Sequence, residues 1–209
     1  MEEAGKLSRK EREKLQRRQE ILSSACKLFS EKGFRETTLE DIAVDSEYGI
    51  GTIYNYFQSK EDIFRSVIQK TLDASFMIMQ HADSTTLSAA DFLRIYTRDL
   101  FRYCIDNKNE FLTLVYFFTS EPGKKNFCKT EYLQQKEENM SRILLKRIDD
   151  GIRNRELRTL NAEHFMVFFT HLVYPYIMHF IQNSTIMEQD IDEHVNSIMD
   201  FVFNGILSK

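Results

Sequence analysis

The stretch 37–64, TTLEDIAVDSEYGIGTIYNYFQSKEDIF, predicts a short helix, a tight turn, a second short helix and the start of a third. Thr38 is placed to cap the first helix, because its hydroxyl can accept a hydrogen bond from the backbone N–H three residues on. Leu39, Ile42 and Ala43 then share one helical face. This order of elements is that of a helix-turn-helix unit.

The second short helix is expected to present polar and aromatic groups to an outside partner. Ile53 and Phe57, four residues apart, form its inward face. A short helix with such an outward face is typical of the element that enters the DNA major groove. The helix contains no Arg or Lys, so base choice must depend on apolar contacts with thymine methyls, on Asn55 and on DNA shape. The residues expected to meet base edges are Ile50, Gly51, Thr52 and Asn55.

Many residues in register form a longer signature: IA at 42–43, GTIYNYF at 51–57, SKEDIF at 59–64, ACKLFSEKGF at 25–34 and TT at 37–38. In these residues the chain resembles the TetR family of bacterial transcriptional regulators. The resemblance covers about residues 17–66. A further segment, GIRNRELR at 151–158, is similar to the link between the seventh and eighth helices of that family.

The resemblance implies an all-α protein of about nine helices in two domains. Residues 1–59 would form a basic arm and a three-helix DNA-binding domain, and residues 60–209 a helical effector-binding and dimerisation domain. The implied function is that of a homodimeric repressor that leaves its double-stranded operator when a small molecule binds. The positions that match phosphate-contacting residues of the family are Thr38, Tyr54, Tyr56 and Lys60.

The turn departs from the family pattern. Family members usually carry Ala-Gly-Val-Ser there, whereas this chain has Ser46, Glu47, Tyr48 and Gly49. Glu47 stands where Gly is common, and a residue with a side chain is strained at positive φ. We therefore expect the details of the turn and the type of operator to differ, with the fold retained.

Basic side chains are concentrated near the N-terminus although the net charge is −4. Residues 6–18 contain seven Lys and Arg against two Glu, and residues 1–60 balance at eleven basic and eleven acidic side chains. The acidic excess therefore lies in residues 61–209. A charge run alone is usually a solvated tail, but beside a helix-turn-helix we favour an arm that contacts phosphates or the minor groove, with Arg17 and Arg18 as candidates.

Composition favours a helical protein of the cytoplasm. The chain has 209 residues, 42% hydrophobic, with only two Pro and seven Gly. Its three cysteines lie far apart, which argues against a disulfide framework or a zinc site. The apolar stretch at 165–181 is interrupted by His171, Pro175 and His179, so we expect no membrane partner.

No catalytic constellation is visible. The sequence has no Gly-x-Ser-x-Gly elbow and no glycine-rich phosphate loop. His164, His171 and His179 recur on one helix face, but no Glu-x-x-His pair accompanies them, so we expect no metal. The alternatives are a small all-helical enzyme, against which the missing constellation argues, and a protein-binding adaptor, against which the basic arm and outward tyrosines argue. We expect no cofactor.

Aromatic residues are concentrated after residue 90, where 12 of the 17 Phe and 6 of the 9 Tyr lie. Such residues suit an effector pocket with apolar walls, and they also suit a dimer interface. The expected effector is accordingly a hydrophobic small molecule. The pocket candidates are Tyr96, Tyr103, Phe111, Tyr116, Phe117, His171 and Tyr174. The candidates for the dimer interface are Phe165, Phe168, Leu172, Ile198 and Val202.

Overall fold

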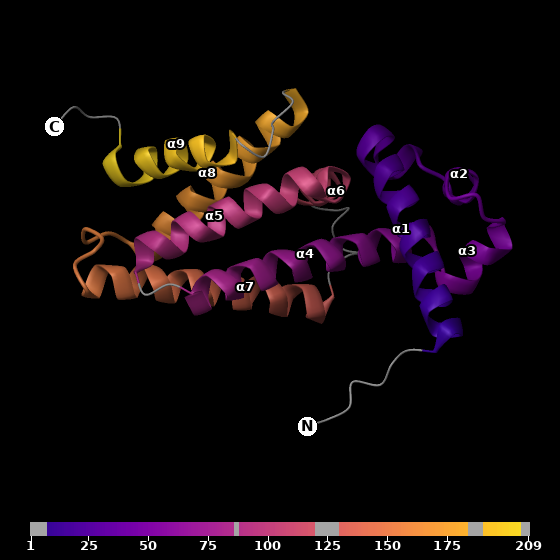
Figure 1. Cartoon of the computed structure of the whole chain (residues 1–209), viewed down its shortest axis with the longest axis horizontal. Helices are drawn as coiled ribbons and strands as arrows, with labels where there is room; N and C mark the ends of the chain where they lie inside the picture. Colours follow the sequence, from indigo (N-terminus) through magenta and orange to yellow (C-terminus); the bar gives the residue numbers. More distant parts are fainter. Residues whose placement is uncertain (1–7, 86–87, 120–129, 184–189, 206–209) are drawn as a thin grey trace. The chain divides into compact units, whose positions relative to one another are not determined.

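The computed structural model describes residues 8–85, 88–119, 130–183 and 190–205, and all regular structure in these ranges is α-helical (Figure 1). The helices are α1 (Arg9–Glu36), α2 (Leu39–Asp45), α3 (Ile50–Tyr56), α4 (Lys60–Thr85), α5 (Ala89–Asp106), α6 (Lys108–Thr119), α7 (Glu131–Arg153), α8 (Ala162–Asn183) and α9 (Ile191–Asn204). Within the described ranges this architecture confirms the expected all-α class and helix number.

The chain divides into two compact units, and α4 contributes to both. The head unit contains α1, α2, α3, the part of α4 up to Lys70, and α6 from Asn109. The body unit contains the remainder of α4 with α5, α7, α8 and α9. The functional boundary at residue 60 stays a prediction.

The head packs around apolar side chains from each of its helices. The rings of Phe29, Phe34 and Phe64 form one aromatic cluster, with centroids 4.8 to 5.6 Å apart. Buried aliphatic side chains, among them Ile42 of α2 and Ile53 of α3, complete this core. The short helices α2 and α3 are therefore held by burial of their inner faces, since helices of seven residues are marginal on their own.

Helix α6 belongs to the head, which the sequence did not predict. Phe111 is only 1% exposed there, and the Tyr116 ring lies edge-on to Phe64 at 6.4 Å. The Thr113 hydroxyl donates to the carbonyl of Asn109 at 2.8 Å and lies 3.7 Å from the Cys26 sulfur. Phe111 and Tyr116 were expected in an effector pocket, but both pack within the head unit because α6 covers α1.

Helix α1 begins well before its apolar stripe of Ile21, Ala25, Leu28 and Phe29, a stripe that predicts a start near residue 16. Ser8 forms a capping box with Glu11, so the first turn is stabilised at Arg9. The basic segment is therefore helical wherever the structure describes it. A glycine directly after an apolar helical stripe, as Gly33 is, predicts the end of the helix in the αL conformation. Gly33 instead has φ 82° and ψ 164°, a region open essentially to glycine alone, and helical residues resume up to Glu36.

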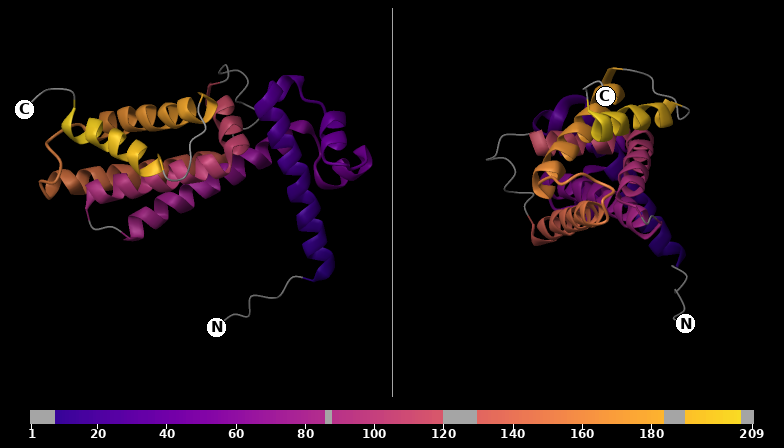
Figure 2. Two further views of the ribbon diagram at one scale, coloured as in Figure 1. Left: turned by 45° about the horizontal axis from the view of Figure 1, so that its top comes forward. Right: turned by 90° about the vertical axis from the view of Figure 1, so that its left-hand side faces the viewer.

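The body has one buried stripe on each of its long helices. In α5, Phe92, Tyr96 and Leu100 are buried as the periodicity predicted. Two ionic contacts tie α4 to α7. Asp73 lies 2.9 Å from the Lys136 ammonium, and Asp83 lies 2.5 Å from Arg147. Because both residue numbers increase from the first pair to the second, α4 and α7 run parallel, as Figure 2 shows.

Candidate nucleic-acid interface

Helix α3 divides into a buried face and an exposed face. Ile53 and Phe57 are 0% and 2% exposed, so they anchor the helix in the head. On the opposite side Ile50, Tyr54 and Asn55 are exposed, and Tyr54 reaches 58%. Large apolar or aromatic groups left exposed on so short a helix are typical of a surface that meets a partner.

The glycine within α3 is not required by the fold. A methyl group built on Gly51 would meet no heavy atom within 4 Å, and its φ is not positive. Gly in a helix is less stable than Ala, so the backbone here carries a cost that packing does not explain. Its absent side chain leaves room for close approach by an outside molecule. Thr52 and Tyr56 are half-buried at the edges of this face.

The turn between α2 and α3 is a Schellman motif with Glu47 in the left-handed position. Glu47 has φ 58°, its N–H donates to Val44 O at 3.2 Å, and the Tyr48 N–H donates to Ala43 O at 3.0 Å. The strain expected from the sequence is therefore present. The same motif ends α7, where Arg155 has φ 61°.

Helix α1 braces α2 and the turn through polar contacts. Lys32 pairs with Asp41 at 2.6 Å, and Lys27 pairs with Asp45 at the same distance. The hydrogen bond from Lys32 lowers the pKa of the Asp41 carboxyl most, and the hydrogen bonds with Thr38 lower it further. Thr38 caps α2 as expected: its hydroxyl accepts from the Asp41 N–H, and Asp41 accepts from the Thr38 N–H. The cap therefore fixes the start of α2.

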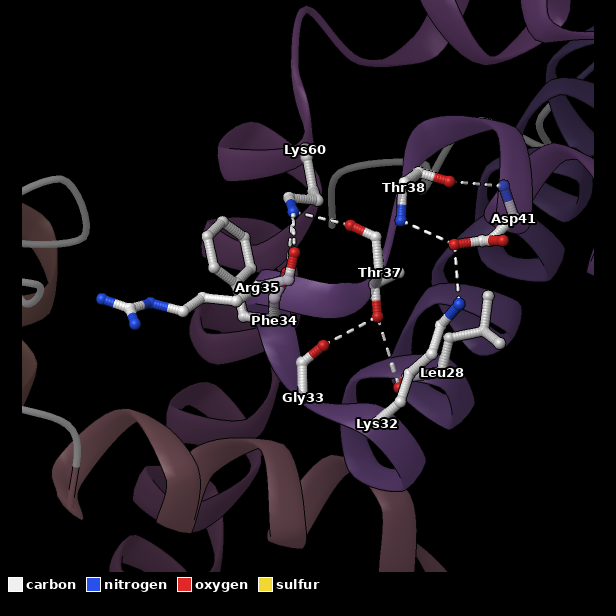
Figure 3. Close-up of polar contacts among 9 residues, drawn as sticks. All are labelled: Leu28, Lys32, Gly33, Phe34, Arg35, Thr37, Thr38, Asp41 and Lys60. Atoms are coloured by element: carbon white, nitrogen blue, oxygen red, sulfur yellow. Dashed lines mark hydrogen bonds and ion pairs between the residues drawn. The ribbon is translucent and has the colours of Figure 1, made fainter.

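Lys60 caps the end of α1. Its ammonium donates to the carbonyl oxygens of Phe34 at 2.8 Å, Arg35 at 3.2 Å and Thr37 at 2.6 Å (Figure 3). It also lies over the Phe34 ring at 4.5 Å. A lysine has three N–H donors, so all three are used inside the head. A phosphate contact from Lys60 stays a prediction, and it would compete with these bonds.

Thr37 is a structural residue that the sequence did not single out as one. Its side chain is fully buried, and its hydroxyl donates to the carbonyl of Gly33 at 2.8 Å (Figure 3). This bond satisfies a backbone oxygen left free by the break in α1. The paired threonines at 37 and 38 thus have separate roles, one closing α1 and one opening α2.

The two arginine candidates of the basic segment have different surroundings. Arg18 is half-buried, donates to the Ser66 hydroxyl at 3.1 Å and lies over the Phe57 ring at 4.9 Å. Arg17 is exposed. Arg18 therefore helps to hold α1 against the rest of the head, whereas Arg17 is accessible to a partner.

The pocket candidates of the body do not form one recognisable site. The hydroxyls of Tyr96 and Tyr174 lie 3.2 Å apart, and burial raises the pKa of Tyr174 to about 12. Tyr103 is half-buried, but His171 is exposed and its ring bonds to the carbonyl of Val167. The side chain of Phe117 lies outside the described part of the chain.

The structure also contains a groove of about 920 Å³ along α7 that includes none of the candidates. It is lined by Gln134, Glu137, Glu138, Ser141, Arg142, Leu145, Lys146, Asp149 and Arg153. Its lining is almost entirely polar and both signs of charge are present. A hydrophobic effector is therefore poorly matched to this groove.

The dimer candidates divide between surface and core. Phe168 is 72% exposed, while Phe165, Leu172 and Val202 are half-buried. Ile198 is only 2% exposed because it packs in the body core, so the expectation that it lies at an interface is corrected. Sequence reasoning missed other exposed apolar side chains of α8 and α9: Val167, Phe201 and Phe203.

Helix α8 is long and apolar enough, by length and composition, to cross a bilayer over Ala162–Gln182, and 22% of that window is buried. The buried residues Phe169, Val173, Ile177 and Ile181 follow one another at intervals of four and form a single stripe. A helix that packs one stripe into a core and presents an apolar face elsewhere also fits a subunit interface.

No cluster of three metal-ligating side chains occurs among the described residues.

Comparison with known proteins gives consistent matches. The family model for bacterial regulatory proteins of the tetR family matches residues 21–67. The uncharacterised helix-turn-helix transcriptional regulator YfiR of Bacillus subtilis (strain 168) is 32% identical over 142 residues, which are 65% of this chain and 67% of that protein. The negative regulator IcaR of the biofilm operon icaADBC in Staphylococcus epidermidis is 26% identical over 62% of this chain and 68% of its own.

A solved structure has the same fold. The crystal structure of FadR from Bacillus subtilis in complex with stearoyl-CoA matches 90% of this chain and 99% of its own, with a TM-score of 0.74 and 19% identity. The family model covers α2, α3 and most of α1, and the match to YfiR extends well beyond them. The chain belongs to the TetR family of bacterial helix-turn-helix transcriptional regulators.

Proposed function

We propose that this protein is a homodimeric repressor that binds operator DNA through α3 and leaves it when a hydrophobic small molecule binds to the body. The observation that carries the proposal is the exposed face of α3, where Ile50 and Asn55 flank the unobstructed backbone of Gly51. Membership of a family of transcriptional regulators supports DNA binding. The relative IcaR is a negative regulator, which supports repression.

The roles within the head follow from position. Ile50, Gly51, Thr52 and Asn55 would meet base edges, with Ile50 against thymine methyls. The hydroxyls of Tyr54, Tyr56 and Thr38 would hold phosphates and fix the register of α3. We assign Lys60 first to holding the head together, because its donors are already used there. We assign Arg18 the same role, because it donates to Ser66 and lies over the Phe57 ring.

The effector would be an amphipathic or hydrophobic molecule. FadR, whose fold this chain shares, binds stearoyl-CoA, so long-chain acyl thioesters are the first candidates to test. The Tyr96 and Tyr174 hydroxyls lie 3.2 Å apart in the body, which also buries the polar side chains of Thr71, Ser75 and Thr97. The two tyrosine hydroxyls would mark the polar end of such a ligand.

The dimer would form through the exposed apolar residues of α8 and α9. Phe168 and Phe201 are the most exposed large apolar side chains of these helices. Such residues are enriched at the buried centre of subunit interfaces. Two heads would then contact successive major grooves, with half-sites about 34 Å apart. We place the protein in the cytoplasm with the chromosome, and we propose no enzymatic activity.

Capture of genomic fragments tests this function. Purified protein is mixed with sheared DNA of its own organism, and bound fragments are sequenced with and without stearoyl-CoA. We expect a few enriched fragments that share an inverted repeat, and fewer of them when the thioester is present. Uniform recovery of all fragments would refute sequence-specific binding. Discrete enrichment that the thioester leaves unchanged would refute only that class of effector.

A further inference from the structure

We propose that residues 9–18 of α1 form a rigid helical arm that lies along the phosphates flanking the operator half-site and stays outside the minor groove. This inference rests on the proposed DNA binding and adds to it a mode of contact. The sequence left two modes open for the basic segment, phosphate contact and minor-groove insertion. The helical geometry of the arm decides between them.

The arm projects beyond the core of the head. The helix starts at Arg9 behind the Ser8 cap, and its first buried residue is Ile21. Arg18 is the first residue of α1 with a side-chain contact to the rest of the head, so the nine residues before it, at 1.5 Å each, carry the helix about 13 Å beyond that contact. Figure 2 shows this end of α1 extending past α2 and α3.

The arm is anchored at its base. Arg18 lies over the ring of Phe57, which follows α3, and donates to Ser66 of α4. Within the arm, Glu11 closes the capping box and Glu13 pairs with Arg9 at 2.8 Å. These contacts hold the arm in one direction relative to α3. A preformed arm loses little conformational entropy when it binds.

Three cations of the arm share one face. Lys10, Lys14 and Arg17 follow the spacing i, i+4, i+7, and all are exposed. None of them forms a hydrogen bond or ion pair with a described residue that would occupy its charge. Arg9 and Arg12 lie on other faces, since each is offset from this stripe by about 100° or more in a helix of 3.6 residues per turn.

The stripe is directed to the side on which the other head helices lie. Its spacing continues to Ile21, four residues after Arg17, and Ile21 is fully buried against the head. The buried face of α1 also includes Leu22, Ala25, Cys26 and Phe29, so the three cations continue the edge of that face that Ile21 marks, past the end of the packed core. Beyond that end, no hydrogen bond, ion pair or ring contact joins the stripe to the other helices of the head among the described residues, and DNA bound by α3 is the surface available to it.

The width of the arm excludes entry of the helix itself into the minor groove. An α-helix with side chains is about 10 to 12 Å across, whereas the minor groove of B-DNA is about 6 Å wide. From Lys10 to Arg17 the stripe is about 10 Å long, which spans about three steps of one DNA strand along the axis. A row of cations of this length matches a run of phosphates and carries no base specificity.

The experiment compares two double variants with equal loss of charge. Lys10→Gln with Lys14→Gln removes the stripe, and Arg9→Gln with Arg12→Gln removes two cations from other faces. Gln keeps helix propensity near that of Lys and Arg, and circular dichroism checks that the helix remains. The probe is a duplex of mixed sequence of about 40 base pairs, and affinity is measured between 50 and 200 mM salt by fluorescence anisotropy.

We expect the stripe variant to lower the slope of log affinity against log salt by about 1.8, which is 0.9 for each lost phosphate contact. The control variant should lower it by less than about 0.5, because Arg12 lies on the side opposite the stripe and Arg9 is already paired with Glu13. Adding Arg17→Gln to the stripe variant should lower the slope by about 0.9 again. Equal losses in the two double variants would overturn the inference.

A second measurement addresses the groove directly. The probes here carry the same half-site with flanking base pairs that are either all A·T or all G·C. Wild-type protein should bind the two duplexes equally, because the phosphates are the same in both. A preference for A·T flanks that the stripe variant loses would show minor-groove contact and overturn the inference. If wild-type protein binds no duplex at all, the proposed function itself fails, so the two failures are distinguishable.

Discussion

Glu47 and Gly51 are each unfavourable to the fold where they stand, and they lie four residues apart. Glu47 adopts a positive φ that suits glycine, while Gly51 occupies a helical position that suits alanine. Residues that break local rules without a packing reason are candidates for function. Substitutions at these two positions can separate the cost to folding from the benefit to DNA binding.

Replacing Glu47 by Gly should stabilise the protein. A residue with a side chain destabilises the folded state by about 1 kcal/mol when it adopts the left-handed conformation, and Gly removes this cost. Gly also gives the unfolded chain more conformational freedom, which offsets part of the gain. We expect the free energy of unfolding to rise by about 0.5 kcal/mol in a urea titration. Glu47→Gln removes the charge and keeps the strained backbone, so it should change the free energy of unfolding little. A less stable Gly variant would contradict the account of the turn.

Replacing Gly51 by Ala should have opposite effects on stability and binding. The new methyl meets open space, so the free energy of unfolding should rise by about 0.5 kcal/mol. The same methyl lies on the face that we place against base edges, and affinity for the operator should fall at least about tenfold. Unfolding and anisotropy titrations measure the two quantities. Operator affinity that rises together with stability would argue against contact at Gly51.

At the scale of the helices, the interiors could be predicted and several ends could not. The spacing of Phe92, Tyr96 and Leu100 predicts the buried stripe of α5, and Thr38 caps α2 as expected. The early start of α1 depends on charged residues without apolar periodicity, so only the Ser8 and Glu11 pair signalled it. Gly33 was identified as a special position, but its ψ depends on the bonds of Thr37 and Lys60 to backbone carbonyls.

The end of α1 gives a prediction at this scale. Lys60→Met keeps the methylene groups over Phe34 but removes the donors to three carbonyls. A charged hydrogen-bond donor that is half-exposed contributes about 1 to 2 kcal/mol, so the free energy of unfolding should fall by that amount. Lys70→Met, which breaks an exposed pair with Glu110, should cost less than about 0.5 kcal/mol.

The same variant tests the alternative use of Lys60. If its ammonium stays on the helix end in the complex, the salt dependence of DNA binding should not change. A decrease of about 0.9 in the slope of log affinity against log salt would show instead that Lys60 contacts a phosphate. The measurement is an anisotropy titration at several salt concentrations, at a temperature where the variant is fully folded.

At the scale of the whole molecule, sequence reasoning succeeded for the fold and for the exposed face of α3. It did not predict that α6 belongs to the head, because short apolar helices look alike whether they line a pocket or cover a neighbouring helix. Phe111 and Tyr116 pack in the head, and their place in an effector pocket stays a prediction. Sequence reasoning failed for Ile198, since a helical stripe predicts burial but cannot distinguish the protomer core from a subunit interface.

The proposed dimer can be tested at Phe168. This side chain is 72% exposed in the protomer, so Phe168→Asp should leave the fold intact. In a dimer the carboxylate would be buried without a partner, and the dissociation constant should rise at least about tenfold. Sedimentation measures the shift toward the monomer mass of 24.8 kDa. Val44→Asp, at an exposed apolar position of α2, should leave the dimer unchanged.

The most direct test of DNA recognition by α3 is the ratio of affinities for a captured genomic site and for a scrambled duplex at equal salt. We expect the affinity of wild-type protein for the site to exceed its affinity for the scrambled duplex by at least about 10³. Asn55→Ala should reduce this preference by about 1 to 3 kcal/mol and leave the affinity for the scrambled duplex unchanged. Equal affinity of the wild-type protein for both duplexes would contradict the account.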